Sequence, residues 1–575
     1  MNKLFTFLLL GWAIQMTAQQ ANIDPLLWAK VNEKGKAECL VILKGQADLS
    51  AAKHLKTKEA KGQFVYQTLT TFAKKSQANL VNYLQTKGIA YRSFWAANVL
   101  ALTADKNLMQ DLAQRQDVLA INENSALYYH KPVEYSKKDK GGIRAVEWGI
   151  QMIEADSVWN AGYTGQGIVV GGQDTGYDWE HEALKDKYRG WDGTLADHNY
   201  NWHDAIHQAD THHSDTLNPC GFNILVPCDD QEHGTHTMGT MVGLSGNEQI
   251  GLAYDAKWVG VRNMERGYGT PTTYIEGFEW FIAPTDLNNA NPLTSKAPDV
   301  INNSWGCPPT EGCNPSNFSI MEQVVANTRA AGIVVVVSAG NSGPSCHSIE
   351  DPAAMFEASF SVGATNWVDT IANFSSRGTV NIDSSNRLKP NISAPGVFIR
   401  SCVPGGTYQS MSGTSMAGPH VAGAVALLLS AAPMLKGNVD SVQHILEMTA
   451  KPLYTEEGCG NDLPTSLPNN VYGHGRLDIW AAVKFVLANQ NTAIETPSEN
   501  IAHLFPNPTQ NSLFIELTDI KDSGTFSLYN VSGQAVLQQE MGAFAQISLA
   551  HLPQGMYFAQ IKTAKGSFSQ RIVKE

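Results

Sequence analysis

The octapeptide Gly413-Thr414-Ser415-Met416-Ala417-Gly418-Pro419-His420 runs directly into residues 421–429, which are apolar at nearly every position. A helix that is apolar all round is normally buried in a protein core. The pattern therefore predicts a buried helix that begins near Ser415, where unpaired N–H groups and the positive end of the helix dipole favour negative charge. A serine that only caps the helix is the simpler interpretation. The flanking glycines and the motifs described below favour a nucleophile.

The sequence before this helix contains short apolar runs that do not alternate strictly with polar residues, and a helix is predicted for residues 319–331. Parallel strands that are covered on both faces have this pattern. We therefore expect residues 145–487 to form an α/β fold with a doubly wound parallel sheet, in which the chemistry lies at the carboxyl ends of the strands. The runs are residues 168–170, 258–261, 300–302 and 333–337.

Two motifs in this region supply a carboxylate and an imidazole. Gly172-Gln173-Asp174-Thr175-Gly176 places Asp174 just after the first predicted strand, although an Asp-Thr-Gly tripeptide alone is weak support because many loops contain one. Glu232-His233-Gly234-Thr235-His236 has two histidines three positions apart, which is the alternative pattern of a zinc site. The intervening glutamate of zinc peptidases is missing. The motif therefore favours His233 as a general base and His236 as a structural neighbour.

A fourth motif, Ser338-Ala339-Gly340-Asn341, follows the predicted strand at residues 333–337. An asparagine side chain can donate an N–H bond to the negative charge of a tetrahedral intermediate, although a turn-forming asparagine would look the same. Acyl transfer requires a nucleophile, a base, a carboxylate that orients the base, and an oxyanion donor. Together the four motifs fill all four roles.

Residues 145–487 resemble the subtilisin-like serine proteases of family S8 through these four motifs, and Asp174, His233 and Ser415 follow one another in that family's order. Residues 239–243, 256–258 and 297–306 are most similar to bacillopeptidase F-like members. The resemblance implies a subtilisin-like doubly wound parallel sheet. It also implies a serine endopeptidase that hydrolyses protein and peptide substrates through an acyl-enzyme intermediate.

The same resemblance assigns roles to single residues. It makes Ser415 the nucleophile, His233 the general base, Asp174 the residue that orients the base, and Asn341 the oxyanion donor. It further implies a substrate cleft with an uncharged S1 pocket that favours apolar or aromatic side chains at P1. The residues expected to line this cleft are Ser304, Trp305, Gly306, Ser338, Ala339 and Gly340.

Residues 1–18 have the features of a secretory signal peptide: a positive start, an apolar run over residues 4–14, and a small residue before the cleavage point. The alternative is a membrane anchor, but this run is shorter than the roughly 20 apolar residues that a span needs. No later stretch is long and apolar enough to cross a bilayer. The sequence therefore predicts no transmembrane segment in the mature chain.

Residues 19–144 predict a small α+β unit of the ferredoxin-like kind, with strands at residues 39–43 and 99–103 and a helix at residues 64–87. An exposed linker with four lysines is expected at residues 130–142. By its layout this region is similar to the inhibitory propeptides of the family, which occupy the cleft until they are cleaved. We expect the cut between residues 135 and 147, because Trp148-Gly149-Ile150 resembles the start of a mature domain.

The end of the chain has a different pattern. Residues 488–500 predict a linker rich in Asn, Thr, Ser and Pro, and residues 501–575 predict a small all-β sandwich. Phe505-Pro506-Asn507-Pro508 and Leu552-Pro553-Gln554-Gly555-Met556-Tyr557 resemble the type A sorting domains of the type IX secretion system of Bacteroidota. This implies Sec export followed by passage through the outer membrane by the type IX machinery, and a secreted or cell-surface protein. A carbohydrate-binding or adhesion module is the alternative.

The formal net charge of −13 argues against nucleic acid as a partner, because phosphate binding requires clustered Lys and Arg. Export permits disulfides, and the eight cysteines include two pairs that are close in sequence, Cys220 with Cys228 and Cys307 with Cys313. Only Cys39 lies in the part expected to be removed. One of the remaining seven thiols is therefore expected to be free or paired elsewhere.

The 59 positions from Asp174 to His233 imply an inserted loop, rich in His and Asp. A metal site and a solvated surface loop are both compatible with this composition, and the second is favoured. Calcium is common in the family, but no complete ligand set can be read, so no metal ligand is assigned. The loop's residues are His198, His203, His207, His212, His213, Asp197, Asp204, Asp210 and Asp215.

Two other classes of protein remain as alternatives to this peptidase. A binding or scaffold protein on an inactive protease fold would usually have lost one residue of the set Asp174, His233, Asn341 and Ser415, which is complete. A sedolisin-type peptidase would need a glutamate as base and an acidic residue in the oxyanion position. His233 and Asn341 argue against it.

Overall fold

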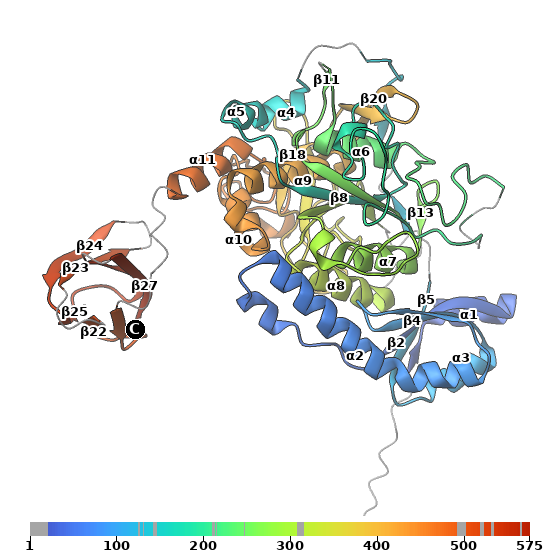
Figure 1. The fold of residues 1–575 in the computed structure, drawn as a ribbon, viewed down its shortest axis with the longest axis horizontal. Helices are drawn as coiled ribbons and strands as arrows, with labels where there is room; N and C mark the ends of the chain where they lie inside the picture. The colour runs from blue at the N-terminus through green and yellow to red at the C-terminus, as the bar shows by residue number, and fades with distance from the viewer. Residues whose placement is uncertain are drawn as a thin grey trace, which may run out of the picture. The chain divides into compact units, whose positions relative to one another are not determined.

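The computed structural model describes the chain in segments, and residues 1–18, with the predicted signal peptide, lie outside them. Contacts divide the chain into two compact units, Met1–Phe485 and Val486–Glu575 (Figure 1), and each is described here by itself. The described segments are residues 21–124, 127–129, 132–141, 146–209, 213, 216–246, 248–306, 315–490, 502–517, 523–530, 534–563 and 566–575.

The centre of the first unit is a seven-stranded sheet in the order β18-β17-β16-β14-β8-β12-β9, and every neighbouring pair in it is parallel. Its strands are almost entirely buried, which explains why their sequences are apolar without strict alternation. The predicted α/β fold with a doubly wound parallel sheet is confirmed. The strands are β8 (Val169–Asp174), β9 (Trp202–Asp204), β12 (Lys257–Arg262), β14 (Val300–Asn303), β16 (Val334–Ser338), β17 (Phe360–Thr365) and β18 (Ile392–Pro395).

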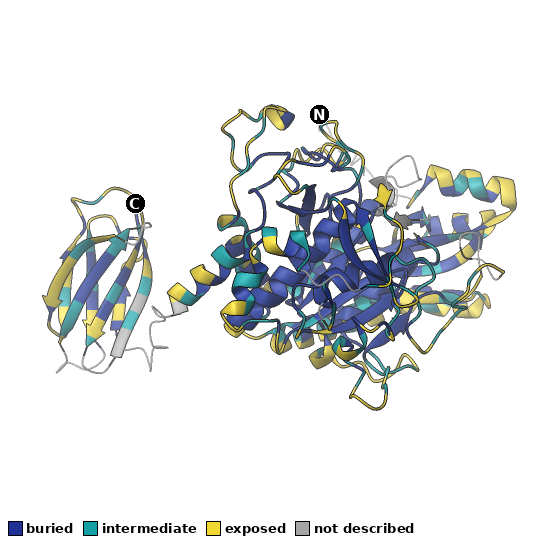
Figure 2. Cartoon of the chain, turned by 90° about the horizontal axis from the view of Figure 1, so that it is seen from above, coloured by how far each residue is buried: buried dark blue, intermediate teal, exposed yellow. Residues whose placement is uncertain are grey.

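Helix α9 (Thr414–Ala431) is buried at every residue, as its apolar sequence predicts. Figure 2 shows the buried residues gathered in the sheet and in the helices that cover it. Helix α6 (His233–Val242) packs closely against α9: a Cβ on Gly423 would lie only 3.2 Å from the Met241 carbonyl oxygen. Among the described helices, α9 alone has the length and hydropathy to cross a membrane, which the sequence was expected to lack after residue 18. Burial of 94% of that stretch inside the protein is typical of a core helix.

Residues 21–124 are a part of the first unit, and we call this part the N-terminal unit. It contains a five-stranded sheet in the order β1-β5-β2-β4-β3. The succession β2-α2-β3-β4-α3-β5 and the order β5-β2-β4-β3 are those of the predicted ferredoxin-like unit, and β1 and α1 (Pro25–Lys34) are additional. The predicted helix at residues 64–87 begins earlier, because Thr57 caps its N-terminus. The remaining elements are β1 (Asn22–Ile23), β2 (Lys36–Leu43), α2 (Lys58–Thr86), β3 (Tyr91–Phe94), β4 (Val99–Asp105), α3 (Lys106–Ala113) and β5 (Val118–Glu123).

The second unit is a sandwich of two antiparallel sheets around one core, with residues such as Leu513 and Phe526 contributed by opposite sheets. The predicted all-β sandwich is confirmed. One sheet contains β21 (Ala502–Phe505), β22 (Ser512–Leu517) and β25 (Phe544–Ser548), and the other contains β24 (Ala535–Met541), β23 (Gly524–Asn530), β26 (Gly555–Thr563) and β27 (Gly566–Lys574).

The described cysteines form two disulfides. Cys220 pairs with Cys228, as predicted from their closeness in sequence, and Cys346 pairs with Cys459, which the sequence did not indicate. Cys39 and Cys402 are buried free thiols. Cys307 and Cys313, the other pair suggested by the sequence, lie outside the described residues.

Candidate active site

The functional motifs lie where three neighbouring strands end. Strand β8 ends at Asp174, and β14 is followed by Ser304. In the sheet, Asn303 is level with Gln173 on β8 and with Val337 on β16. The next residues along these strands are Asp174, Ser304 and Ser338, so the three residues lie at one edge of the sheet, as parallel topology predicts.

Asp174 and His233 form a buried pair. The Nδ1 atom of His233 lies 2.8 Å from one carboxylate oxygen of Asp174 and 3.0 Å from the other, and both side chains are only 1% exposed. The carboxylate is itself held, because the Thr175 N–H donates to it at 2.8 Å. A carboxylate on Nδ1 fixes the proton there and leaves Nε2 to exchange protons.

Ser415 is the second residue of α9, and its turn is tied to the ends of the neighbouring strands. The hydroxyl of Ser304 donates to the Ser415 carbonyl at 3.2 Å, and the hydroxyl of Ser338 donates to the Thr414 carbonyl at 2.9 Å. The Gly340 N–H donates to the Thr414 hydroxyl at 3.2 Å. These buried contacts fix the start of α9 at the same sheet edge as Asp174.

The amide of Asn341 has a defined orientation. Its Oδ1 accepts from the Thr414 N–H at 2.9 Å and from the Thr414 hydroxyl at 2.8 Å. These two hydrogen bonds identify the oxygen of the side-chain amide, and its Nδ2 group is the donor. Asn341 thus lies beside the predicted nucleophile.

The side chains of the residues expected to line the cleft are buried. Trp305 is fully buried, and its ring centroid lies 3.9 Å from that of Tyr274 in the core, so its side chain does not face a cleft. Ser304, Ser338 and Ala339 are also fully buried. Alternation along the short strand β15 (Trp305–Gly306) turns the indole inward, which a two-residue strand does not reveal in sequence.

The backbone at this edge is paired with a segment of the same chain. Strand β6 (Leu127–Tyr129) lies between β13 (Tyr268–Gly269) and β15, antiparallel to both. Further along the same segment, β7 (Glu134–Tyr135) pairs with β20 (Thr407–Ser412), which ends three residues before Ser415. We call residues 127–129 and 132–141 the crossing segment.

Backbone contacts between the crossing segment and β20 lie close to the nucleophile. The Val133 N–H donates to the Ser412 carbonyl at 2.7 Å, and the Ser136 N–H donates to the Ser410 carbonyl at 2.9 Å. Asp139 forms an ion pair with Arg400 at 2.7 Å. Part of this region is exposed, as the linker prediction requires, but it is also paired as a strand, which that prediction missed.

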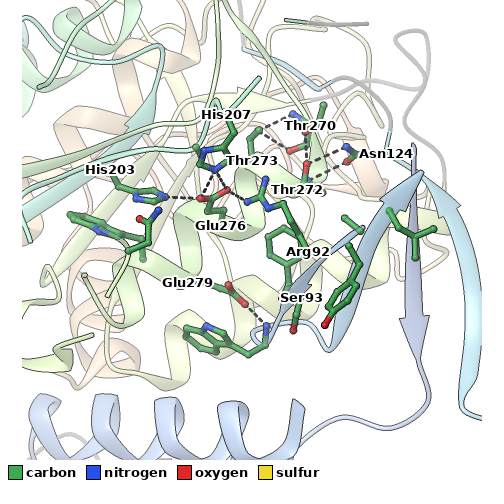
Figure 3. Close-up of a pocket in the computed structure, with 18 of the residues that line it drawn as sticks. Arg92, Ser93, Asn124, His203, His207, Thr270, Thr272, Thr273, Glu276 and Glu279 are labelled. Atoms are coloured by element: carbon green, nitrogen blue, oxygen red, sulfur yellow. Dashed lines mark hydrogen bonds and ion pairs between the residues drawn. The ribbon is translucent and has the colours of Figure 1, made fainter. Parts of the chain in front are cut away.

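Titratable side chains gather in a second place, where the N-terminal unit meets α7 (Pro271–Ile282) around a cavity of about 940 Å³. Figure 3 shows Glu276 facing Arg92, His203 and His207. Arg92 forms an ion pair with Glu276, and the two imidazoles lie 2.9 and 2.8 Å from its carboxylate. Burial opposes protonation of His207, but Glu276 outweighs it and raises the pKa of His207.

This cluster corrects the prediction of a solvated histidine-rich loop. His203 and Asp204 are buried, and Asp204 lies 3.5 Å from Arg262. Asp210, His212 and Asp215 lie outside the described residues. Within the parts of the chain that the structure describes, no group of three or more His, Cys, Asp or Glu residues is arranged to hold a metal ion.

His236, three positions after His233, is a structural residue. Its Nε2 lies 3.1 Å from the carbonyl oxygens of Ile399 and Gln409, and burial lowers its pKa to about 3. Burial likewise lowers the pKa of His420 to about 4. Both rings are therefore neutral in the folded protein at neutral pH.

We expect His236→Gln to reduce the acid sensitivity of the fold. The folded protein binds fewer protons than the unfolded chain between pH 6.5 and about 3, so the stability from neutral His236 is present above pH 6.5 and is lost as the pH falls. This loss amounts to about 1.4 kcal/mol per pH unit. Urea unfolding at pH 7 and pH 4.5 measures it. An unchanged difference between the two pH values in the variant would contradict the assignment.

Comparisons with known proteins agree with this geometry. The subtilase family matches residues 165–475, and the secretion system C-terminal sorting domain matches residues 503–575. Bacillopeptidase F of Bacillus subtilis (strain 168) is 38% identical over 461 residues, which are 76% of this chain and 29% of that protein. Subtilisin E of the same strain is 29% identical over 421 residues, which are 73% of this chain and 88% of that protein.

Among solved structures, the epidermin leader peptide processing serine protease of Staphylococcus aureus has a TM-score of 0.57 and 16% sequence identity, and the match covers 78% of this chain and 99% of that one. This likeness supports the fold. The family match covers more than half of the sequence and includes all four motifs. The chain therefore belongs to the subtilase family of serine proteases and carries a secretion system C-terminal sorting domain after its protease region.

Proposed function

We propose that this protein is a serine endopeptidase that cleaves protein and peptide substrates through an acyl-enzyme intermediate on Ser415. The observation that carries the proposal is the His233–Asp174 pair, with Nδ1 within 3.0 Å of both carboxylate oxygens. It lies at the sheet edge to which Ser304 and Ser338 tie the Ser415 turn. Loss of casein hydrolysis in the secreted Ser415→Ala variant tests the proposal.

The proposed reaction begins when the Ser415 hydroxyl attacks the scissile carbonyl carbon and His233 Nε2 takes its proton. Asp174 stabilises the imidazolium, and the side-chain amide N–H of Asn341 and the backbone N–H of Ser415 donate to the oxyanion. His233 then protonates the leaving amine, and an ester joins the acyl group to Ser415. A water molecule, deprotonated by His233, hydrolyses this ester and restores the serine.

Replacing Asn341 with leucine is expected to lower kcat by about 10²–10³-fold, the usual effect of removing one oxyanion donor. KM should change little, because the donor acts mainly on the charge that develops in the transition state. Steady-state hydrolysis of a chromogenic peptide measures both constants. Asn327→Leu is the control, because its amide binds the Ala96 carbonyl at 2.6 Å. A kcat for Asn341→Leu equal to that of the wild type would remove this residue from the mechanism.

We also propose that the N-terminal unit and the crossing segment are an inhibitory propeptide. Strands β6 and β7 pair with the backbone on the two sides of the Ser415 turn, where a substrate would have to lie. Tyr129 pairs with Trp305, and a Cβ on Gly413 would lie 3.7 Å from the Cα of Pro132, so we place the first cut between Tyr129 and Pro132. This position is upstream of the interval of residues 135–147 that the sequence suggested.

Contacts outside the cleft support this proposal, because they hold the N-terminal unit on the catalytic region. Lys58 donates to Asp299 at 2.7 Å, and Glu279 accepts an N–H bond from Ala96 at 2.7 Å. Arg92 pairs with Glu276 in the cluster of Figure 3. An inhibitor held at several places stays bound after one peptide bond is cut.

Arg92→Ala should weaken the hold of the cleaved N-terminal fragment by about fivefold, or about 1 kcal/mol, because the arginine end of this ion pair is partly exposed. Activity should then appear sooner after processing. The measurement is a time course of hydrolysis and of fragment retained on the enzyme. Arg115→Ala is the control, because Arg115 pairs with Asp117 inside the N-terminal unit. Equal time courses for the two variants would exclude Arg92 from inhibitor binding.

For export, the sorting domain indicates type IX passage to the cell surface or the medium. We propose that Sec export, directed by residues 1–18, comes first. Deleting residues 501–575 should then leave the protein in the periplasm, whereas unchanged release into the medium would contradict this route.

The uncharged cleft residues further lead us to propose apolar or aromatic side chains at P1, which profiling with a peptide library checks.

A further inference from the structure

Asp229 is a charged group at the active site to which the proposed reaction gives no role. It lies four residues before His233, in the loop that leads into α6. One carboxylate oxygen accepts from the backbone N–H groups of Gln231 at 3.0 Å and Glu232 at 2.9 Å. Burial of the carboxyl group raises the pKa of Asp229, and the Gln231 N–H acts against that shift.

The same carboxylate binds the residues next to both members of the catalytic pair. Thr175, which follows Asp174, donates its hydroxyl to Asp229 at 2.8 Å. Thr235, at the start of α6, donates its N–H at 2.9 Å and its hydroxyl at 2.6 Å to the other oxygen. One carboxylate with five donors therefore connects the end of β8 to the first turn of α6.

Two further contacts close this connection. The Thr175 hydroxyl accepts from the Gly234 N–H at 3.0 Å. A Cβ on Gly176 would lie 1.8 Å from the Cys228 carbonyl oxygen, and a Cβ on Gly234 would lie 2.1 Å from the Gly176 carbonyl oxygen. The end of β8, the Cys228–Asp229 loop and the start of α6 thus touch backbone to backbone, and none of them can shift alone.

We propose that Asp229 is a positioning residue that sets the alignment of His233 against Asp174. The inference rests on the proposed function, since it assumes that this pair drives the reaction. Five donors require an acceptor at every position around the carboxylate, and an asparagine would point its own N–H groups at some of them. The first turn of α6 would then shift, and a displacement of about 1 Å at a catalytic group can lower the rate by about 10²-fold.

Asp230 provides a matched control, because it is a buried carboxylate one position along. It accepts from Arg262 at 2.7 Å and from the Arg266 N–H at 2.8 Å. Its partner Arg262 lies beside Asp174 on the neighbouring strand β12, but the hydrogen bonds of Thr175 and Thr235 go to Asp229. Asp229→Asn and Asp230→Asn therefore both disturb a buried charge near the site, but only the first removes the acceptor that joins Thr175 to Thr235.

The experiment compares the full-length wild type with Asp229→Asn, Asp230→Asn and Ser415→Ala. Each is secreted and, where self-processing fails, matured with a trace of wild-type enzyme. Hydrolysis of a chromogenic peptide gives kcat, KM and the pH dependence of kcat/KM, and thermal unfolding gives stability. For Asp229→Asn we expect kcat about 30–100-fold lower with KM within about twofold. The acid limb of its pH profile should move to lower pH, because a misaligned Asp174 stabilises the protonated imidazole less.

Asp230→Asn should lose stability while kcat stays within about threefold of the wild type, with an unchanged pH profile. A wild-type kcat and pH profile in Asp229→Asn would overturn the inference. Equal losses of kcat in both variants without any change in pH profile would also overturn it, because the effect would then be structural. A wild type as inactive as Ser415→Ala would instead contradict the proposed function.

Discussion

Ser415→Ala is expected to lower kcat by about 10⁶-fold, the loss that removal of the nucleophile causes in subtilisin. Only one hydroxyl is deleted, and the contacts that Ser304 and Ser338 make to the backbone of this turn remain. The loss should therefore be chemical and leave the fold intact. The same variant should keep its N-terminal unit, because the bond crossing the cleft is no longer cut. Casein hydrolysis and the intact mass of the secreted protein measure the two effects.

Ser430→Ala is the matched control for this experiment. Ser430 lies on the same helix, where its hydroxyl binds the Leu427 carbonyl at 2.8 Å, so its loss disturbs α9 without touching the site. This control should process and hydrolyse like the wild type. Near-normal turnover in Ser415→Ala would rule out the assigned nucleophile. Complete processing of Ser415→Ala would show that another protease removes the N-terminal unit.

His233→Ala is expected to cost about the same factor of 10⁶, and adding Ser415→Ala should lower kcat little further. Both residues act in one proton transfer, so removing either disables the same step. Both carboxylate oxygens of Asp174 lie within 3.0 Å of His233 Nδ1, so Asp174 acts on the reaction through His233. Hydrolysis rates of the two single variants and the double variant give the coupling between the residues.

His236→Gln serves as the control, because this second histidine lies on the same helix and binds the backbone carbonyls of Ile399 and Gln409. Its kcat at pH 7 should stay within about tenfold of the wild type. If the kcat losses of His233→Ala and Ser415→Ala multiplied in the double variant, the two residues would not share one step. A larger loss from His236→Gln than from His233→Ala would mean that the wrong histidine was assigned as base.

Much of this fold could be predicted because its signals are local. The uninterrupted apolar strands required burial on both faces, and the apolar run after Ser415 required a core helix. Parallel topology then brought Asp174, Ser304 and Ser338 to one edge without any knowledge of the loops. The ferredoxin-like unit and the sandwich followed from strand spacing in the same way.

The features that the sequence did not indicate depend on partners far along the chain. Cys346 and Cys459 are 113 positions apart, and nothing near either residue identifies the other. Residues 132–141 looked like a linker because a strand on a sheet edge is stabilised by the backbone of β20 rather than by its own apolar pattern.

Asp229 was also missed, because an Asp-Asp pair in a polar loop has the sequence of a solvated turn. Its place four residues before the predicted base was the available signal. The direction of the Trp305 side chain could not be read from the sequence for a related reason, since on a two-residue strand it depends on packing against Tyr274 and its neighbours.

The central claim, that Ser415 is an activated nucleophile, is tested most directly by covalent labelling with a fluorophosphonate. The reagent reacts with a serine only when a base removes its proton and an oxyanion hole stabilises the adduct. We predict one label per processed wild-type chain, located by peptide mapping on Ser415, loss of hydrolysis in proportion to labelling, and no label in Ser415→Ala or His233→Ala. A label on another serine, or full hydrolytic activity in a protein that takes up none, would contradict the assignment.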